Sequence, residues 1–398
     1  MFSEGRIGNL ILPNRLVRSA TWDPSILGSR KMTDEVLSLY RELAAGGVGL
    51  IITGGFPVYQ EGRPGSAGSD KRTYTYADLQ VEGIDRLAAA VHASGTGCKI
   101  VAQLEVGTVN AGPSDVPSPF REDRLRPLSA EEVRKIINCF VEATVKMKEA
   151  GFDGVQYHAA HGGLVSRFLS PYTNRRDDEY GGSVKNRARI VRESISQARK
   201  EVGDFPILVK MNCTDYVEGG IGAETFPELA REIEDAGVDA LEISGGMWEC
   251  LVRSEEELGF RPVPAPESHT RIERLDQQSY FLRYAGRLAL HIPAILVGGN
   301  RDVERLEAIV RQGKVDFIAL CRPMICEPDL PNRWLAGRGS STAACISCNS
   351  CIYAMIVHPG RPEPGVVTCV YKHDQPQHRM AQRWLAAWVS KNAQPPAG

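Results

Sequence analysis

Residues 154–163 read Gly-Val-Gln-Tyr-His-Ala-Ala-His-Gly-Gly, an apolar run that passes directly into two histidines. The run has the length and composition of a buried strand, so His158 and His161 are expected at its carboxyl end. Residues 170–178 then form a long polar connection, which is usually functional in a compact α/β pattern. Two imidazoles at a strand end can donate hydrogen bonds to one ligand oxygen. A zinc-binding pair or two buried structural histidines would give the same local pattern.

The same alternation of strand and helix extends over most of the chain. Short apolar runs predict strands at 16–19, 48–53, 98–104, 155–158, 207–211, 240–244, 294–297 and 317–320. Helical spacing predicts helices at 34–45, 76–93, 130–150, 185–202, 226–236, 280–290 and 303–312. Eight such units of fully apolar strands predict an α/β fold, the (β/α)8 TIM barrel. A doubly wound open sheet is the alternative, but no Gly-x-Gly-x-x-Gly turn follows an early strand.

Composition narrows the class of protein. The chain has 398 residues, 42% of them hydrophobic, and a formal net charge of -2. This balance gives no reason to expect nucleic acid or an anionic membrane surface as a partner. No apolar run is long enough to span a bilayer, and the first residues lack a signal-peptide pattern, so we expect a cytoplasmic protein. We predict a barrel domain at 1–340 and a C-terminal extension at 341–398, which ends in an amphipathic helix from Gln377 onward.

Several motifs after the histidine pair carry a resemblance to a known family. They are His-x-x-His-Gly at 158–162, Phe-Leu-Ser-Pro at 168–171, Thr-Asn-Arg-Arg at 173–176, Asp-Glu-Tyr-Gly-Gly-Ser at 178–183 and Asn-Arg-x-Arg at 186–189. In this order they resemble the Old Yellow Enzyme family of FMN oxidoreductases. The resemblance implies that His158 and His161 hold the activating oxygen of an unsaturated substrate. The sequence departs from the family at Gly163, where the family usually has a proton-donating tyrosine.

The resemblance also implies where FMN binds. Gly298 and Gly299 follow the seventh strand, and Cys321 and Arg322 follow the eighth. Glycine lets backbone N–H groups approach a phosphate, arginine can pair with it, and barrels often bind phosphate at this place. At other strand ends the family match places Gln103 at the isoalloxazine edge and Lys210 against its N1/O2 side. A cation there stabilises the reduced flavin. Further positions expected along the ring are Ser19, Ala20, Thr21 and Gly54.

Two of these assignments have alternatives, and one segment departs from the family pattern. Trp22 replaces Thr21 as the ring neighbour if the alignment shifts by one residue. Lys210 would serve a purely structural role if it formed a barrel-interior salt bridge with Glu242. The third strand continues with Glu105 and Gly107, whereas many family members continue with a His and a Gly-Arg. The loop above the flavin ring is therefore specific to this chain.

Four cysteines near the C-terminus form a second motif. Cys345, Cys348 and Cys351 are separated by two residues each, and Cys369 follows after a Pro- and Gly-rich gap. Such spacing suits tetrahedral zinc or a [4Fe–4S] cluster. The position resembles that of the cluster in the 2,4-dienoyl-CoA reductase and trimethylamine dehydrogenase branch, although the gap is longer here. The sequence also ends before the FAD or NAD(P) domain of that branch would begin, and reduced thiols without metal are a third interpretation.

Together these features predict an FMN-dependent oxidoreductase that uses NAD(P)H and reduces alkenes conjugated to a carbonyl. Because Gly163 replaces the tyrosine, the proton must come from water or from another tyrosine such as Tyr172, unless the enzyme favours oxidation or an acceptor that needs no proton. An electron-transfer module that serves a partner subunit is the main alternative, and a catalytically inactive zinc-binding barrel is another. We expect a small-molecule substrate, and the sequence leaves open a homo-oligomer or a redox partner subunit.

Overall fold

A computed structural model describes residues 1–23, 31–61, 73–75, 81–107, 109–117, 125–261, 263–357 and 366–392. Eight parallel strands form a closed ring, because β14 pairs with β3 as well as with β13. The strands are β3 (Leu16–Arg18), β4 (Leu50–Ile52), β7 (Lys99–Val106), β10 (Gly154–Ala159), β11 (Ile207–Asn212), β12 (Ala240–Ser244), β13 (Ala294–Leu296) and β14 (Phe317–Leu320). The predicted TIM barrel is confirmed.

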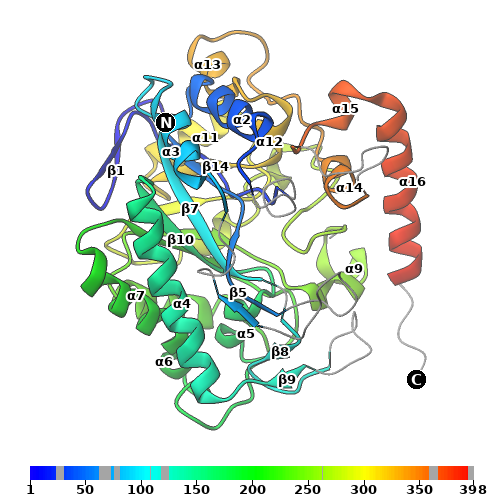
Figure 1. Cartoon of the computed structure of the whole chain (residues 1–398). Helices are drawn as coiled ribbons and strands as arrows, with labels where there is room; N and C mark the ends of the chain where they lie inside the picture. The colour runs from blue at the N-terminus through cyan, green and yellow to red at the C-terminus, as the bar shows by residue number, and fades with distance from the viewer. Residues whose placement is uncertain are drawn as a thin grey trace.

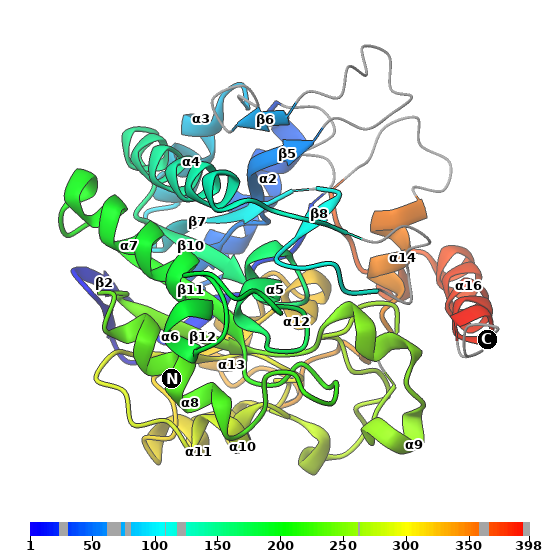
Figure 2. The same ribbon diagram turned by 90° about the horizontal axis from the view of Figure 1, so that it is seen from below.

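Helices surround this ring on the outside (Figures 1 and 2). They are α2 (Asp34–Ala45), α3 (Ile84–His92), α4 (Ala130–Glu149), α6 (Val184–Arg187), α7 (Arg189–Val202), α8 (Thr225–Glu234), α10 (Leu282–Ala285), α11 (Val303–Arg311) and α12 (Arg322–Cys326). The long helix α4 begins at a capping box, in which Ser129 and Glu132 satisfy each other's backbone N–H groups. Apolar residues of the helices and the outer strand faces form one large core between the two layers.

A second, smaller core fills the amino end of the barrel. The hairpin of β1 (Gly5–Ile7) and β2 (Leu10–Leu12) packs its apolar side chains against barrel residues near the amino ends of the strands, such as Leu208 and Phe317. A Cβ atom at Gly5 would lie 2.6 Å from the Phe317 ring, so only glycine fits at this contact. Since the hairpin covers the amino end, the carboxyl end is the face where a ligand site can form.

Several predicted helix boundaries were wrong. The helix predicted at 76–93 begins at Ile84, because Gly83 adopts φ +76° directly before it, and residues 76–80 lie outside the described part. The segment predicted as one helix at 185–202 consists of α6 and α7, which meet at Ala188. Only Leu282–Ala285 is helical within the predicted 280–290. The hairpin of β5 (Phe56–Glu61) and β6 (Thr73–Thr75), which extends the sheet beside β7, was not predicted.

The C-terminal segment forms a small helical group beside the barrel. After α13 (Leu330–Leu335) it contains α14 (Ser350–Val357), α15 (Val370–His373) and α16 (Gln375–Asn392). Figure 1 shows α14, α15 and α16 together at one side of the molecule, away from α4 and α7. The terminal helix that the sequence predicted corresponds to α16. No helix in the described residues has the length and apolarity needed to cross a membrane.

Candidate active site

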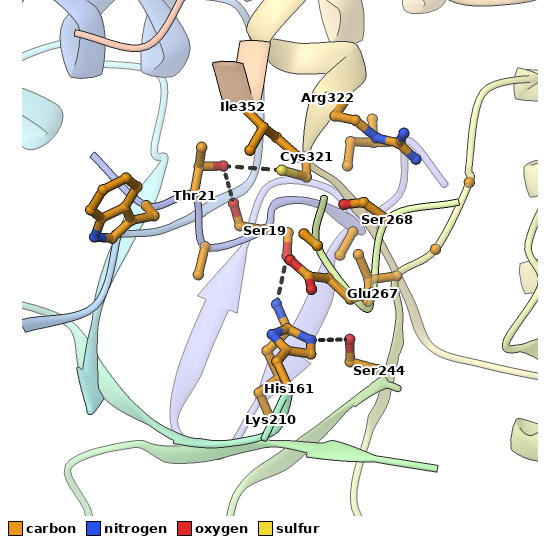
Figure 3. Close-up of a pocket in the computed structure, with 18 of the residues that line it drawn as sticks. Ser19, Thr21, His161, Lys210, Ser244, Glu267, Ser268, Cys321, Arg322 and Ile352 are labelled. Atoms are coloured by element: carbon orange, nitrogen blue, oxygen red, sulfur yellow. Dashed lines mark hydrogen bonds between the residues drawn. The ribbon is translucent and has the colours of Figure 1, made fainter. Parts of the chain in front are cut away.

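A cavity of about 740 Å³ opens at the carboxyl end of the barrel. Its size is in the usual range for a small-molecule or cofactor site. Of the predicted site residues in and around the barrel, those that line it are Ser19, Ala20, Thr21, Gln103, His158, His161, Lys210, Gly298, Gly299, Cys321 and Arg322. Figure 3 shows how several of them converge from different strands. The sequence therefore predicted eleven of the residues that line this cavity, while other polar lining residues, such as Glu105, Ser244 and Arg301, were not predicted.

Gly54 is the exception among these residues. It does not line the cavity, whereas its neighbour Gly55 does. A Cβ atom at Gly54 would lie 2.6 Å from the carbonyl oxygen of Thr21, so this glycine lets two strand ends approach each other. Thr21 and Trp22 both line the cavity, and Trp22 remains 46% exposed at its rim. The structure thus places both alternatives for the ring neighbour at the cavity.

A buried polar network forms below the cavity. Lys210 Nζ lies 3.1 Å from Glu242 Oε1 and donates to Ser19 Oγ at 3.0 Å. Ser19 Oγ also donates to Glu242 Oε1 at 2.7 Å. Gln156 Nε2 donates to the other carboxylate oxygen, and Gln103 Nε2 donates to Gln156 Oε1, both at 2.8 Å. The salt bridge considered as an alternative for Lys210 is present, and Lys210 lines the cavity as well.

The two histidines lie side by side, with ring centroids 5.1 Å apart. His161 Nε2 is 2.6 Å from Ser244 Oγ at the end of β12, a partner that the sequence did not indicate. His158 Nδ1 is buried and has no hydrogen-bond partner among the described residues. Burial, followed by the charge of Lys210, lowers the pKa of His158 to about 3. Burial, followed by His158 and Lys210, also lowers the pKa of His161, so both rings are neutral at physiological pH.

The opposite end of the cavity contains a buried cation. Arg322 Nη1 donates to His269 O at 2.8 Å and to Asn349 Oδ1 at 2.6 Å. Both partners are neutral, and within the described residues no carboxylate forms an ion pair with Arg322. A guanidinium that is only 9% exposed and not neutralised by an acid favours a bound anion. Gly298 and Gly299, with φ +110° and +70°, complete this end of the cavity.

Two carboxylic acids line the cavity, and neither was predicted as a site residue. Glu105 follows Gln103 on β7, and burial raises its pKa to about 7. Glu267 comes from the loop after β12, and burial raises its pKa against the opposing charges of Lys210 and Arg322. Tyr172, considered as a proton donor from the sequence, is not among the lining residues.

The loop between β12 and β13 covers part of the cavity with aromatic side chains. His269 is stacked between Phe260 and Tyr280, with ring centroids 3.5 Å and 3.7 Å away. Tyr280 lines the cavity and donates its hydroxyl to the carbonyl oxygen of Glu267 at 2.7 Å. The C-terminal segment also reaches the cavity through Ile352 and Trp384. These contacts were not predicted, because they join segments far apart in sequence.

The four predicted metal-binding cysteines gather around a second, small cavity of about 20 Å³. Cys369 interacts with a fifth thiol, Cys326, which donates a hydrogen bond and lowers the pKa of Cys369 to about 6. Cys351, Ile325 and Arg322 line both this cavity and the main one. Within the described residues, no three His, Cys, Asp or Glu side chains are arranged closely enough to hold a metal ion.

The main cavity fits a flavin mononucleotide on three observations. Its volume suits a cofactor of that size. The uncompensated guanidinium of Arg322 suits a phosphate. The amide of Gln103 and the ammonium of Lys210 suit the polar edge of a flavin ring, and both line the same cavity.

Comparison with known proteins agrees with this geometry. Residues 1–340 match the model of the NADH:flavin oxidoreductase / NADH oxidase family. The chain is 34% identical to an NADH oxidase of Thermoanaerobacter brockii over 364 residues, which is 88% of this chain and 52% of that protein. It is 36% identical to an NADPH dehydrogenase of Listeria monocytogenes over 252 residues, which is 62% of this chain and 73% of that protein. The chain spans about half the length of the first of these relatives.

Solved structures show the same fold. A 2-naphthoyl-CoA reductase in complex with 2-naphthoyl-CoA aligns over 97% of this chain and 58% of that one, with a TM-score of 0.76 and 24% identity. An Old Yellow Enzyme homologue from Zymomonas mobilis aligns over 87% and 95%, with a TM-score of 0.64 and 24% identity. The family model and the curated relatives confirm the resemblance found in the sequence. The chain therefore belongs to the NADH:flavin oxidoreductase / NADH oxidase family, which includes the Old Yellow Enzymes.

Proposed function

We propose that this protein is an FMN-dependent reductase that oxidises NAD(P)H and reduces alkenes conjugated to a carbonyl group. The observation that supports this function best is the convergence of His158, His161, Lys210 and Arg322 on one cavity at the carboxyl end of the barrel. Arg322 would hold the FMN phosphate, while Gln103 and Lys210 would hold the flavin ring. When bound, FMN takes a hydride from NAD(P)H and supplies it to the β-carbon of the acceptor.

The histidine pair would bind the carbonyl oxygen of the acceptor. Both imidazoles are neutral, so each has one N–H group to donate. If the Ser244 hydroxyl donates to His161 Nε2, the ring proton lies on Nδ1, and Ser244 fixes the orientation of that donor. Hydrogen bonds to the carbonyl oxygen strengthen as negative charge develops on it, so they stabilise the transition state more than the ground state.

Lys210 would place a positive charge beside the flavin ring. Glu242 and Ser19 hold its ammonium group in place, so the cation is preorganised and needs little rearrangement when charge appears nearby. The carboxylate of Glu242, 3.1 Å away, places an opposite charge beside the buried ammonium group. The network through Gln156 to Gln103 then fixes both flavin-facing side chains in one arrangement.

Anaerobic kinetics with 2-cyclohexenone as acceptor test this proposal. We expect the FMN-loaded protein to consume NADH or NADPH in step with the enone. The double variant His158→Ala/His161→Ala should retain FMN but lose turnover by roughly 10²–10³ for each donor removed. Equal turnover in the wild type and the double variant would contradict the assigned role of the histidines.

A second candidate function is one-electron transfer through the cysteine site to a partner subunit. It is favoured by one observation: Cys351, Ile325 and Arg322 form a common wall between the cysteine cavity and the main cavity. In the present arrangement of the described residues the cysteines are not close enough to hold a metal ion, so a [4Fe–4S] cluster on Cys345, Cys348, Cys351 and Cys369 would require these thiols to move closer together beside the flavin site. Iron analysis of anaerobically prepared protein tests this, with about four irons per chain expected. One zinc per chain, or free thiols without metal, would contradict it.

A further inference from the structure

The missing tyrosine leaves the proposed reaction without an evident proton donor. A Cβ atom at Gly163 would have Ala160 O at 3.4 Å and His158 Cδ2 at 3.8 Å as its nearest neighbours, so the position is open and contributes no acid. Tyr172 does not line the cavity. A donor must therefore come from another cavity residue or from water.

Most hydroxyl and thiol groups in the cavity are engaged elsewhere. Tyr280 donates to a backbone carbonyl, Ser244 interacts with His161, and Ser19 donates to Glu242. Cys321 Sγ lies 3.2 Å from Thr21 Oγ1, next to the buried arginine and away from His161 (Figure 3). Burial raises the pKa of Glu267 as well, but the opposing charges of Lys210 and Arg322 act on its carboxyl group. No such charge opposes burial at Glu105, which is the better candidate of the two acids.

Strand register places Glu105 on the cavity side of β7. In the parallel pairing of β7 with β10, Gln103 is opposite Gln156 and Leu104 is opposite Tyr157. Side chains alternate along a strand, so Gln103 and Glu105 point to the same side, as do Gln156 and His158. The hydrogen bond between the two glutamines shows that this side is the barrel interior. Glu105 lies one pleat nearer the cavity than Gln103 on the same side of β7, and both Glu105 and His158 line the cavity.

The surroundings of Glu105 favour a neutral acid. In the pairing of β7 with β5, Glu105 is opposite Pro57. The carboxyl group of Glu105 packs on Gly55, where a Cβ atom would lie 2.4 Å from Glu105 Cδ. Among the described residues, Glu105 forms no hydrogen bond or ion pair. The neighbours on β5, β10 and the Gly55 segment therefore supply no cation, and His158 is neutral. Burial without compensation raises the pKa of Glu105 to about 7.

We propose that Glu105 delivers the proton to the α-carbon of the substrate in this site. This inference rests on the proposed ene-reductase function. The β-carbon accepts a hydride, and the π electron pair moves toward the carbonyl oxygen that the histidines bind. The O–H bond of Glu105 then breaks as the α-carbon C–H bond forms, and water returns a proton to the carboxylate. The alkene is reduced by two electrons, NAD(P)H is oxidised, and one proton is taken from solvent.

The test separates the half-reactions in the wild type and the isosteric variant Glu105→Gln. Reduction of the bound flavin by NAD(P)H should be equally fast in both. Reoxidation of the reduced protein by 2-cyclohexenone should be ~10²–10⁴-fold slower in the variant, because a positioned general acid usually accelerates a reaction by this factor. Reoxidation by ferricyanide, which needs no carbon protonation, should be unchanged, and this controls for folding and flavin content.

Two further measurements separate a catalytic role from a structural one. Infrared spectra of flavin-free wild type should show a carboxylic acid band that disappears between pH 6 and pH 8 around the pKa of about 7 and is absent from Glu105→Gln. Adding Gly163→Tyr to Glu105→Gln should restore enone reoxidation, because a phenol then occupies the open position next to His158.

The outcomes distinguish the two proposals. A wild type that reduces no enone would overturn the proposed function and this inference with it. A wild type that reduces 2-cyclohexenone as fast as Glu105→Gln does would overturn only the role of Glu105. Equal slowing with the enone and with ferricyanide would also overturn it, because that pattern indicates a structural defect.

Discussion

Lys210 Nζ and Glu242 Oε1 lie 3.1 Å apart, and both side chains are almost completely buried below the main cavity. The pair joins β11 to β12, whose register places the two residues directly opposite each other. It combines two functions that the sequence presented as alternatives: it stabilises the barrel interior and it holds a cation at the proposed flavin site.

Replacing Lys210 with Met should therefore destabilise the fold. The change leaves Glu242 buried without its cation, and such a loss costs about 3–5 kcal/mol of unfolding free energy. Urea unfolding followed by circular dichroism measures it. The double variant Lys210→Met/Glu242→Gln should recover part of the loss, because the unpaired charge is gone. A single variant as stable as the wild type would show that the pair contributes nothing.

Enone turnover should depend on pH through Glu105. The protonated carboxyl is the donor, and its pKa is about 7, so the oxidative half-reaction should be fast below pH 7 and should slow as pH rises above it. Both histidines have lowered pKa values and stay neutral in this range, and Arg322 has a raised pKa and keeps its charge. Lys210 and Arg301 also line the cavity, as does Glu267, whose pKa burial raises. Stopped-flow reoxidation between pH 5.5 and 9, a range chosen to span the pKa of about 7, measures the profile. A rate that does not fall across this range would count against the assignment.

Trp384 should influence the binding of large apolar acceptors. Its side chain lines the cavity, and its ring centroid lies 5.6 Å from that of Tyr353. Trp384→Ala removes this wall, and losing roughly 1.5 kcal/mol of aromatic contact would raise KM about tenfold. Met380→Ala on the same helix, at a residue 44% exposed, is the matched control and should leave KM unchanged. Identical KM values for both variants would place Trp384 outside the substrate site.

The cysteine site predicts a specific pattern of metal loss. If a [4Fe–4S] cluster is held there, Cys345→Ser and Cys351→Ser should each lower iron content well below the ~4 atoms per chain of the wild type. Cys98→Ser, at a buried thiol just before β7, should retain full iron. Iron analysis and the visible absorption of anaerobic samples decide between the outcomes. Equal iron in all three variants would exclude these cysteines as ligands.

The sequence predicted the fold well because each barrel strand is a short, continuous apolar run. It also indicated that Gln103, Lys210 and Arg322 lie at the carboxyl face, since they end or directly follow such runs, while their proposed roles at the flavin came from the family resemblance. It did not identify Glu242 and Gln156 as parts of one network, because their contacts depend on strand register. Register is a property of neighbouring strands, and the apolar pattern of one strand does not determine it.

The part of the family motifs that follows the histidine pair has a structural role here. Asn174 Nδ2 donates to Phe168 O at 2.7 Å and to Tyr180 O at 2.8 Å, so it fixes the long loop after β10. None of these three residues lines the cavity. Trp384 reaches the cavity from a helix more than two hundred residues after His158, and no local pattern indicates such a contact.

Flavin binding tests the central claim most directly. Flavin-free wild type, titrated with FMN and followed by quenching of flavin fluorescence, should bind one FMN per chain and become yellow. Arg322→Ala should retain its fold but bind FMN much more weakly, because the phosphate loses its buried cation. A hydrogen bond to a charged group contributes about 1.5–3 kcal/mol, and the binding free energy should weaken by that amount. Riboflavin, which lacks the phosphate, should bind the wild type and the variant equally. Wild-type protein that binds no FMN, or a variant with unchanged FMN affinity, would contradict this account.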